Sequence, residues 1–433
     1  MPEPSNSSQL ENNDYATQPV QKSDTVNGFK IAMINGSLAF SVPGLITGIE
    51  VGNAIGFQDS LIAFLIGGLF LAILGAITGI VGRQNRLTSC MTLKFVFGRN
   101  GADIISALFV LALLGWYGIN LDLFSASLSE LSWQLFSYTP DIIALEIVIG
   151  MVITFTTIFG FRMIEKISNW LVPVFIILLL YLLFQSLMTI DWQNIAPGVA
   201  ASMSLSEAIA IVVGSFIVSV VLMPDFTRFA RTNKDAVTAS VLPFLGISSF
   251  VYIVSAIAGL AAASNDVLAV MLTLGLGSAA LFLLIASSWI TNVVNLYSAA
   301  LGTNAIVNKW QEKTIIIAMG VIGTIVASMN LLDRFTDFLF GLSVVFTPVA
   351  AIYIIDFFVI RAKKLYSISD LDQTARFSFA ALSAWLLGIA MAISVNSNYF
   401  TITTFEVVDA LLIAALAYMV LIKAEEVFKA SKV

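Results

Sequence analysis

Long apolar stretches separated by short polar segments run along most of the chain. Each is close to the roughly 20 residues that an α-helix needs to cross the hydrocarbon core of a bilayer. Twelve such stretches lie near residues 28–54, 59–82, 102–129, 139–160, 168–188, 207–223, 237–262, 279–303, 314–329, 335–360, 377–396 and 402–424. The pattern predicts an all-α integral membrane protein with 12 transmembrane helices in a single bilayer domain.

The composition supports this prediction and excludes several function classes. Of the 433 residues, 58% are hydrophobic and only 11% are charged, and the mean hydropathy is +0.94. The chain has no histidine and a single cysteine, Cys90, so it offers no zinc cluster, no Cys–His nucleophile and no internal disulfide. The net charge of -6 and the scattering of the basic residues among loops argue against nucleic-acid binding. We therefore expect neither an enzyme nor a bound cofactor.

Charge placement predicts the orientation in the membrane. Residues 1–27 are polar and rich in Ser, Asn, Pro and acids, which predicts a disordered cytoplasmic tail. With the N-terminus inside and twelve spans, Arg334 is the one basic residue out of 21 that falls on the outer side. Because Lys and Arg concentrate in cytoplasmic loops, we expect both termini to be cytoplasmic and the protein to lie in the plasma (inner) membrane.

Two short matches between the halves of the chain indicate an internal repeat. Gly36–Val42 (GSLAFSV) in the first span matches Gly214–Val220 (GSFIVSV) in the sixth, and Trp116 with the following LFSASL matches Trp289 with the following LYSAAL in the eighth. Matching spans are five apart, and units of five spans lie in opposite orientations in the membrane. This is typical of transporters with inverted repeats, whose interrupted helices surround the binding site.

The repeat predicts the organisation of the chain. The transporter core would cover residues 28–365, with spans 1–5 at about 28–190 and spans 6–10 at about 205–362, and residues 366–433 would add spans 11 and 12 and a short cytoplasmic C-terminus. Helices 1 and 6 would be broken at their Gly-Ser pairs. The alternative is that these small residues only allow close helix contacts.

Several motifs resemble the nucleobase-cation symporter family one, also known as the purine/cytosine permease family, and most closely its bacterial cytosine-transporting members. They are VGSFI at 213–217, DFTRFAR at 225–231, GWYG at 115–118, WITN at 289–292 with LY at 296–297, and Thr347-Pro348 with Asp356. The resemblance runs in order from about residue 30 to 365. It implies a leucine-transporter-like fold of ten helices plus two, and cation-coupled transport of nucleobases, hydantoins and related heterocycles.

The resemblance also implies a substrate site. Trp116 and Phe216 would enclose a flat ring, Gly214 and Ser215 would offer freed backbone groups and a hydroxyl to its edge, and Asn292 would donate and accept hydrogen bonds. The chain departs from the cytosine-transporting pattern at Leu113 and Val218, where polar side chains are expected. Asn120 lies one helical turn after Trp116 on the same face and is positioned to compensate.

The coupling ion is either Na+ or H+. By resemblance, Na+ would bind carbonyls of Ser37, Phe40 and Ser287 and the hydroxyl of Thr291, while Ile290 replaces a second hydroxyl and Ser287 could turn its own hydroxyl inward. Intramembrane acids offer the proton alternative, since a carboxylate is costly there: Glu50, Asp122 and Glu146. Asp122 matches Asn295 in the repeat, so a hydrogen bond between helices is an equally open interpretation.

We therefore expect a secondary active importer of a small planar heterocycle, a nucleobase such as cytosine or a related pyrimidine or purine, working by cation symport and alternating access. An amino-acid carrier or a hydantoin or vitamin-precursor carrier of the same fold is the alternative within transporters. The paired helix interruptions argue against a channel, and the absence of GxSxG and GxxxxGK motifs argues against a membrane enzyme. The partners would be the substrate and membrane lipid, and the sequence leaves the oligomeric state open.

Overall fold

The computed structural model describes residues 18–190, 203–307, 310–362 and 364–430, and these residues are helical almost throughout. Seven of their helices are long and apolar enough to cross a membrane, or eight when the bent pair α1 and α2 counts as one span. Three further apolar helical segments are shorter: Ile142–Ile158 and Pro173–Thr189, which are the two ends of helix α6 (Ile142–Thr189), and Leu205–Val221. The prediction of an all-helical membrane protein with many spans is confirmed.

The first predicted span is a broken helix. Helix α1 (Gly28–Ser37) and helix α2 (Val42–Ile55) meet at an angle of 71°. Ser41, which precedes α2, has an extended backbone, and Pro43 in the first turn of α2 has no N–H with which to continue a helix from α1. A tight turn closes α1, because the N–H of Phe40 donates to the carbonyl of Ser37 at 3.2 Å. The predicted interruption of helix 1 is confirmed.

The sixth predicted span is interrupted at a different place from the one expected. Helix α7 (Leu205–Val221) passes through Gly214 and Ser215 without a break, and the helical path changes at Leu222, before the short helix α8 (Met223–Thr227) with its Pro224. The prediction of a break within 214–220 is therefore wrong. A Cβ at Gly214 would overlap the carbonyl oxygen of Leu339 in helix α14 (Phe335–Ile355). This glycine serves a close helix contact, which is the alternative that the sequence left open.

Two other predicted boundaries differ from the structure. Spans 4 and 5 form one continuous helix, α6 (Ile142–Thr189), because the stretch between them contains strong helix formers and the only proline, Pro173, comes at the start of the second apolar part. Span 7 is made of α9 (Asn233–Val241), a π-helical turn η2 (Leu242–Ser248) and α10 (Ser249–Ala262). Proline at position 243 accounts for the wider turn, since it cannot donate a regular helical hydrogen bond.

The remaining elements follow the predicted spans closely, and they include short helices after spans 2 and 7 that the sequence did not indicate. These two short helices are α4 (Ser89–Phe97) and α11 (Val267–Thr273). The long elements are α3 (Phe57–Asn85), α5 (Arg99–Phe136), α12 (Gly277–Ile306), α13 (Glu312–Ala327), α14 with the π turn η4 (Asp356–Ile360), α15 (Phe379–Asn396) and α16 (Glu406–Ala430). Short 3-10 turns complete the described chain: η1 (Lys22–Asp24), η3 (Leu331–Arg334) and η5 (Ile368–Gln373).

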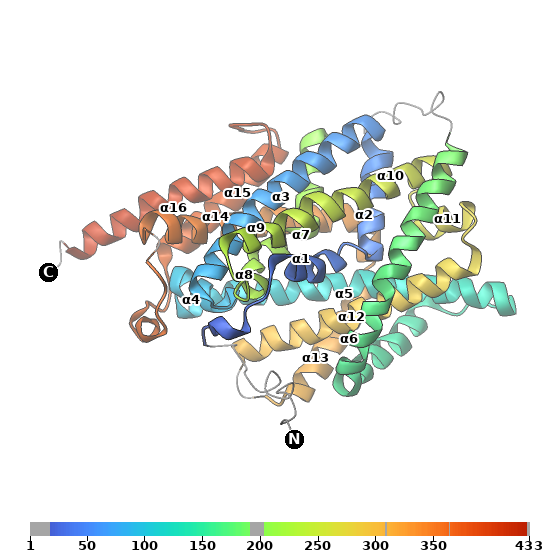
Figure 1. The fold of residues 1–433 in the computed structure, drawn as a ribbon, viewed down its shortest axis with the longest axis horizontal. Helices are drawn as coiled ribbons and strands as arrows, with labels where there is room; N and C mark the ends of the chain where they lie inside the picture. The colour runs from blue at the N-terminus through green and yellow to red at the C-terminus, as the bar shows by residue number, and fades with distance from the viewer. Residues whose placement is uncertain (1–17, 191–202, 308–309, 363, 431–433) are drawn as a thin grey trace, which may run out of the picture.

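The helices pack in two groups, and the most extensive contact between the groups is that of α10 with α6. Figure 1 shows the arrangement of the helices. In the first group, called the bundle below, α2 packs against α10, α3 against α7 and α9, and α1 against α9. In the second group, called the scaffold, α5 packs along α12 and α13, and α6 packs against the same two helices. Helix α14 contacts α7 and α16, and α15 contacts α16.

A buried carboxylate fastens the C-terminal helix to α14. Asp356 is 3% exposed and accepts hydrogen bonds from the hydroxyls of Tyr366 at 2.8 Å and Tyr418 at 2.7 Å, and from Nε of Arg361 at 3.0 Å. A buried charge is tolerated only when it is paired and hydrogen-bonded, and here both oxygens are satisfied. The added segment 366–433 is therefore tied to the core at Asp356.

The N-terminal segment is ordered from residue 18 onward. Val20 is buried, its N–H donates to the carbonyl of Arg86 at the end of α3, and the N–H of Val26 donates to the carbonyl of Phe229 at 2.8 Å. The carboxylate of Asp235 accepts the N–H of Gly28 at 2.7 Å. The prediction of disorder is wrong for residues 18–27, which we call the N-terminal strap; residues 1–17 lie outside the described part.

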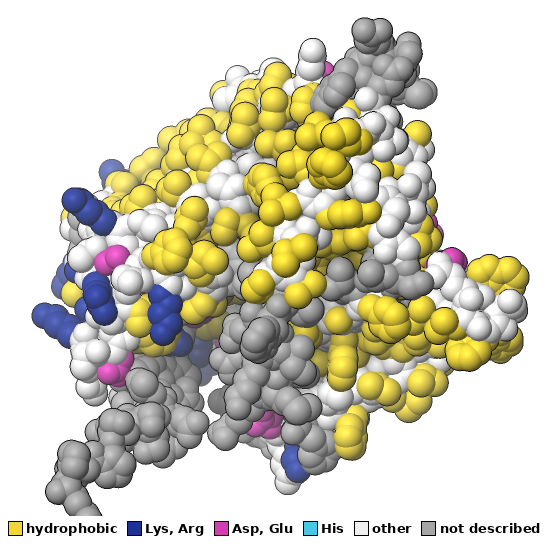
Figure 2. Space-filling model, turned by 45° about the vertical axis from the view of Figure 1, so that its right-hand side comes forward, with side chains coloured by type: hydrophobic (Ala, Val, Ile, Leu, Met, Phe, Trp, Pro, Cys, Tyr) yellow, Lys and Arg dark blue, Asp and Glu magenta, His cyan; other side chains and the backbone are white. Residues whose placement is uncertain are grey.

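Side-chain character on the surface matches a membrane-embedded protein. In Figure 2, hydrophobic side chains cover most of the visible face and the visible Lys and Arg gather mainly toward one end. Large apolar residues such as Phe155, Ile177 and Val420 are more than half exposed.

The single cysteine, Cys90, lies in α4. Burial raises the pKa of its thiol to about 11, and the hydroxyl of Ser106 lies 3.9 Å from its sulfur.

The contact at Gly214 leads to a stability prediction. We expect Gly214→Ala to destabilise the protein by about 1–3 kcal/mol, because a Cβ would force α7 away from the Leu339 carbonyl. Gly341→Ala in α14 is the matched control, since a Cβ there meets no atom within 4 Å. The midpoint of thermal unfolding in detergent checks this, and equal midpoints for the two variants would refute the role of Gly214.

Candidate substrate and cation site

Trp116 is positioned by helix α5 and by aromatic residues of α14. Its ring meets Phe338 and Phe335 nearly edge-on, with centroid distances of 5.3 and 6.1 Å. A Cβ at the neighbouring Gly115 would lie 2.5 Å from the Phe338 ring, so the glycine lets α14 approach at this point. These edge-to-face contacts hold the ring in one orientation, and Trp116 remains only half-buried.

Asn120 lies one turn beyond Trp116, as the helical spacing predicts. It is 1% exposed, its Nδ2 donates to the carbonyl of Trp116 at 2.8 Å, and its Oδ1 has no hydrogen-bond partner. A buried amide oxygen without a partner costs free energy unless a ligand or water donates to it. Asn120 thus offers an acceptor beside the Trp116 ring.

Ser215 and Phe216 come from α7 and face η2 and α10. The hydroxyl of Ser215 donates to the carbonyl of Val212 at 2.6 Å, so the hydroxyl of Tyr252, 2.7 Å away, donates to it. The Phe216 ring is 8% exposed and lies 5.7 Å from the ring of Phe244. The Ser215 hydroxyl is already engaged, and Tyr252 is a partner that sequence reasoning did not identify.

Trp116 and Phe216, the predicted aromatic pair, both contact the main apolar cluster, although their rings pack against different helices. Phe216 belongs to the main buried cluster and Trp116 packs against its edge. Asn292 on α12 is fully buried. The two positions that depart from the cytosine-transporting pattern are apolar in their surroundings as well, because Val218 lies in the main cluster and Leu113 packs beside Val110 and Ala299.

The predicted cation residues come from the break between α1 and α2 and from α12, and α2 and α12 are in contact. Ser37 ends α1 and its hydroxyl donates to the carbonyl of Ile34, while Phe40 lies in the break. On α12, Ser287 is buried and Thr291 is half-buried. Ile290 packs into a separate cluster with residues of α5 and α6, so its side chain faces the scaffold rather than the break. No group of three or more acidic or Cys side chains suited to a metal occurs in the described residues.

Unpartnered buried polar atoms gather on four of the helices that should surround the site. On α1, α5, α12 and α14 these atoms are Asn35 Oδ1, Asn120 Oδ1, Ser288 Oγ and Thr347 Oγ1. Such atoms are rare in folded proteins and call for a partner. Asn35, Ser288 and Thr347 were missed because a polar residue in an apolar span does not by itself reveal which way it points.

The three intramembrane acids are placed differently from one another. Glu50 in α2 is half-buried, whereas Asp122 in α5 and Glu146 in α6 are almost completely buried. Neither oxygen of Asp122 nor Oε2 of Glu146 has a hydrogen-bond partner. For Asp122, the predicted alternative of a hydrogen bond between helices would be a contact with Glu146, whose carboxyl group lies beside it on α6.

The fold resembles solved transporters over nearly its whole length. It matches the inward-facing conformation of Mhp1 with a TM-score of 0.84 at 19% identity, covering 94% of this chain and 93% of that one. It also matches an outward-open, Na+-coupled sialic acid symporter with a TM-score of 0.61 at 11% identity, covering 94% and 92% of the two chains. These similarities confirm the leucine-transporter-like fold.

Curated relatives and a family match agree with this fold. The chain is 27% identical to the cytosine permease of Escherichia coli (strain K12) over 413 residues, 95% of this chain and 94% of the relative. It is 25% identical to the hydantoin permease of Microbacterium maritypicum over 386 residues, 81% and 76% of the two chains. Residues 21–421 match the family described as permeases for cytosine/purines, uracil, thiamine and allantoin. The protein therefore belongs to this family, the nucleobase-cation symporter family one, and is a membrane transporter rather than an enzyme.

Proposed function

We propose that the protein imports a small planar heterocycle, a nucleobase such as cytosine or a related pyrimidine or purine, by cation symport. The observation that carries the proposal is the break between α1 and α2, together with buried polar atoms on α5, α12 and α14 that lack partners. Backbone groups freed in a membrane need a polar partner, and a ligand with donors and acceptors on a flat ring would meet that need. The cytosine and hydantoin permeases among its relatives support the choice of substrate class.

The transport core is proposed to be two inverted copies of five spans, followed by two added spans. The protein would lie in the plasma membrane with both termini in the cytoplasm. A reciprocal contact supports the inversion. A Cβ at Gly150 in α6 would meet the Thr324 side chain of α13, and a Cβ at Gly320 in α13 would meet the Thr154 side chain of α6. Both Gly-to-Thr pairs have the same spacing and lie 170 residues apart, and such reciprocity is typical of a two-fold axis between two copies.

Within the site, Trp116 and Phe216 would enclose the ring, and Asn120 and Asn292 would read its edge. Ser215 and Gly214 would form part of the wall of the substrate site. The hydroxyl of Ser215 is hydrogen-bonded to Tyr252, and Gly214 packs closely against α14. The Na+ ligands are proposed to be Ser37, Phe40, Ser287 and Thr291, a set of oxygen donors that fits a hard cation. Alternating access would arise from movement of the bundle against the scaffold.

Uptake into proteoliposomes tests the function directly. Purified protein is offered labelled nucleobases, hydantoins, thiamine and amino acids, with inward Na+ and proton gradients applied separately. We expect accumulation of a nucleobase that depends on an imposed cation gradient. Accumulation of amino acids alone would refute the substrate class, and flux without gradient dependence would refute symport.

Removal of the proposed stacking surface should weaken binding. We expect Trp116→Ala to lower the apparent substrate affinity about tenfold or more, because stacking of a base on an aromatic ring contributes about 1–3 kcal/mol. Trp133→Ala on the same helix is the control, since Trp133 is 52% exposed and lies away from the core. Substrate binding to purified protein, measured by calorimetry, checks the difference, and unchanged affinity in Trp116→Ala would exclude the proposed pocket.

The Na+ site predicts an effect on coupling rather than on substrate binding alone. We expect Thr291→Ala to raise the Na+ concentration for half-maximal uptake about tenfold, because one oxygen ligand to a charged group is lost. Ile290→Val should leave this concentration unchanged, since Ile290 packs into the scaffold cluster. Uptake measured across a series of Na+ concentrations checks both variants, and an unchanged Na+ dependence in Thr291→Ala would contradict the assigned site.

A further inference from the structure

Two carboxyl groups face each other between α5 and α6 of the scaffold. Asp122 is 9% exposed and Glu146 is 4% exposed, and each lies within electrostatic reach of the other. The other charged groups that face them are also acids, Asp333 of η3 and Asp141 at the start of α6. In the described part of the chain, no Lys or Arg forms an ion pair with either carboxyl. Two like charges at this depth cannot both persist without a counter-charge.

The polar atoms around this pair lack partners. Both oxygens of Asp122 and Oε2 of Glu146 accept no hydrogen bond, and the hydroxyl of Ser125 is fully buried and also unpartnered. Ser125 follows Asp122 by three residues and therefore lies on the same face of α5. A proton on one carboxyl removes a charge and creates a donor for the other groups. Protonation would thus satisfy the polar atoms that the fold leaves open.

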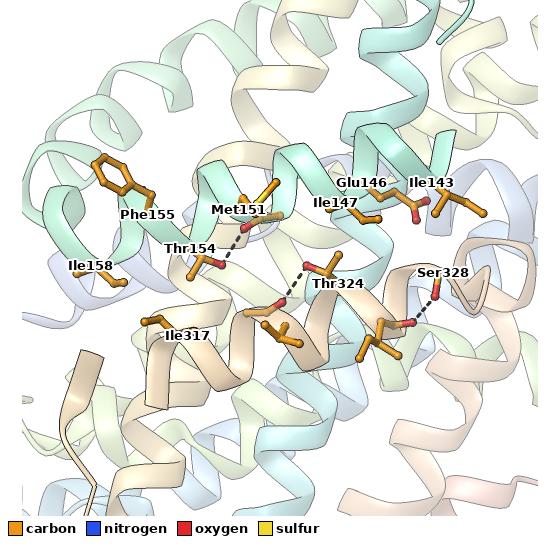
Figure 3. Close-up of a pocket in the computed structure, with 14 residues that line it drawn as sticks. Ile143, Glu146, Ile147, Met151, Thr154, Phe155, Ile158, Ile317, Thr324 and Ser328 are labelled. Carbon is orange, nitrogen blue, oxygen red and sulfur yellow. Dashed lines mark hydrogen bonds between the residues drawn. The ribbon is translucent and has the colours of Figure 1, made fainter. Parts of the chain in front are cut away.

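The surroundings of Glu146 favour the neutral form. Glu146 lines one end of an apolar groove of about 600 Å³ between α6 and α13, near Ser328 (Figure 3). Elsewhere the groove is lined by residues such as Met151 and Phe155, which are about 60% exposed on the outer surface. Gly150 and Thr154 continue the same face of α6, and Thr154 donates to the Gly150 carbonyl. A permanently ionised carboxylate beside such a surface would be costly.

The second repeat shows that the fold does not require these acids. When the halves are aligned on Trp116 with Trp289 and on Gly150 with Gly320, Asp122 corresponds to Asn295 and Glu146 corresponds to Ile316. Ile316 is buried in the same scaffold cluster as residues of α5 and α6. The equivalent helix contact is therefore built without a carboxyl group. Two buried acids in one copy only are better explained by a function than by packing.

We propose that Asp122 and Glu146 together hold one exchangeable proton, and that release and rebinding of this proton is a step of the transport cycle. The ligand of this site is a proton, and the site is separate from the proposed Na+ ligands on α1 and α12. The proposal rests on the proposed function for its transport step, whereas the shared proton itself does not depend on which substrate is carried.

Infrared difference spectroscopy tests the shared proton on the purified protein. During a pH titration we expect the carbonyl stretch of a protonated carboxylic acid, and we expect the Asp122→Asn/Glu146→Gln double variant to lose it. Glu130→Gln is the control on the same helix, because Glu130 bonds to Gln134 on an exposed face. A titration unchanged in the double variant would overturn the proposal, and so would a pair that remains ionised and responds to Na+ instead.

Proteoliposomes test the step in the transport cycle. In Asp122→Asn and in Glu146→Gln we expect uptake driven by an inward proton gradient to fall at least tenfold, while exchange of substrate at equal concentrations on both sides continues. Continued exchange would show that the variants fold and bind. Proton-driven uptake at the wild-type level in both variants would overturn the transport role. If the wild-type protein carried no nucleobase at all, the proposed function would fail, and the spectroscopic result would still decide whether the proton is shared.

Discussion

The need to satisfy backbone hydrogen bonds inside a bilayer governs this structure. A polar backbone group without a partner costs several kcal/mol in hydrocarbon, so the break between α1 and α2 is tolerable only inside the protein. Ala39 and Val42 on either side of Phe40 are buried, and α2 is covered by α10, α7 and α12. The interruption thus lies inside the protein, and the unpartnered polar atoms on α5, α12 and α14 are buried as well, away from membrane lipid.

Close approach between helices is the second requirement, and it is met by glycine. Gly214 against Leu339 brings α7 to α14, and the Gly150–Thr324 and Gly320–Thr154 contacts bring α6 to α13. In a membrane, close packing replaces much of the hydrophobic driving force that holds soluble helices together. The same residue type therefore serves opposite purposes: Gly44 lies just beyond a helix break, whereas Gly214 lies within an unbroken helix.

This double use of glycine explains where sequence reasoning succeeded and where it failed. The spans themselves were predictable, because about 20 apolar residues leave few alternatives, and in helix 1 the break predicted at the Gly-Ser pair occurs just before Pro43. In helix 6 the Gly-Ser pair lacked a following proline, and the interruption occurs at Leu222 before Pro224 instead. Trp116 was expected from the family resemblance and Asn120 from its helical spacing to Trp116, whereas Tyr252 and Phe338 come from distant spans and their directions depend on tertiary packing.

The N-terminal strap has a practical consequence for observing motion. Its contacts reach the end of α3 through Arg86 and the segment after α8 through Phe229, and both belong to the bundle side of the molecule. A label on the strap would therefore travel with the bundle and report its rotation relative to a label on α13. Since the only native thiol is half-buried and resists ionisation, cysteines introduced at exposed strap and α13 positions would react with maleimide dyes against a low background.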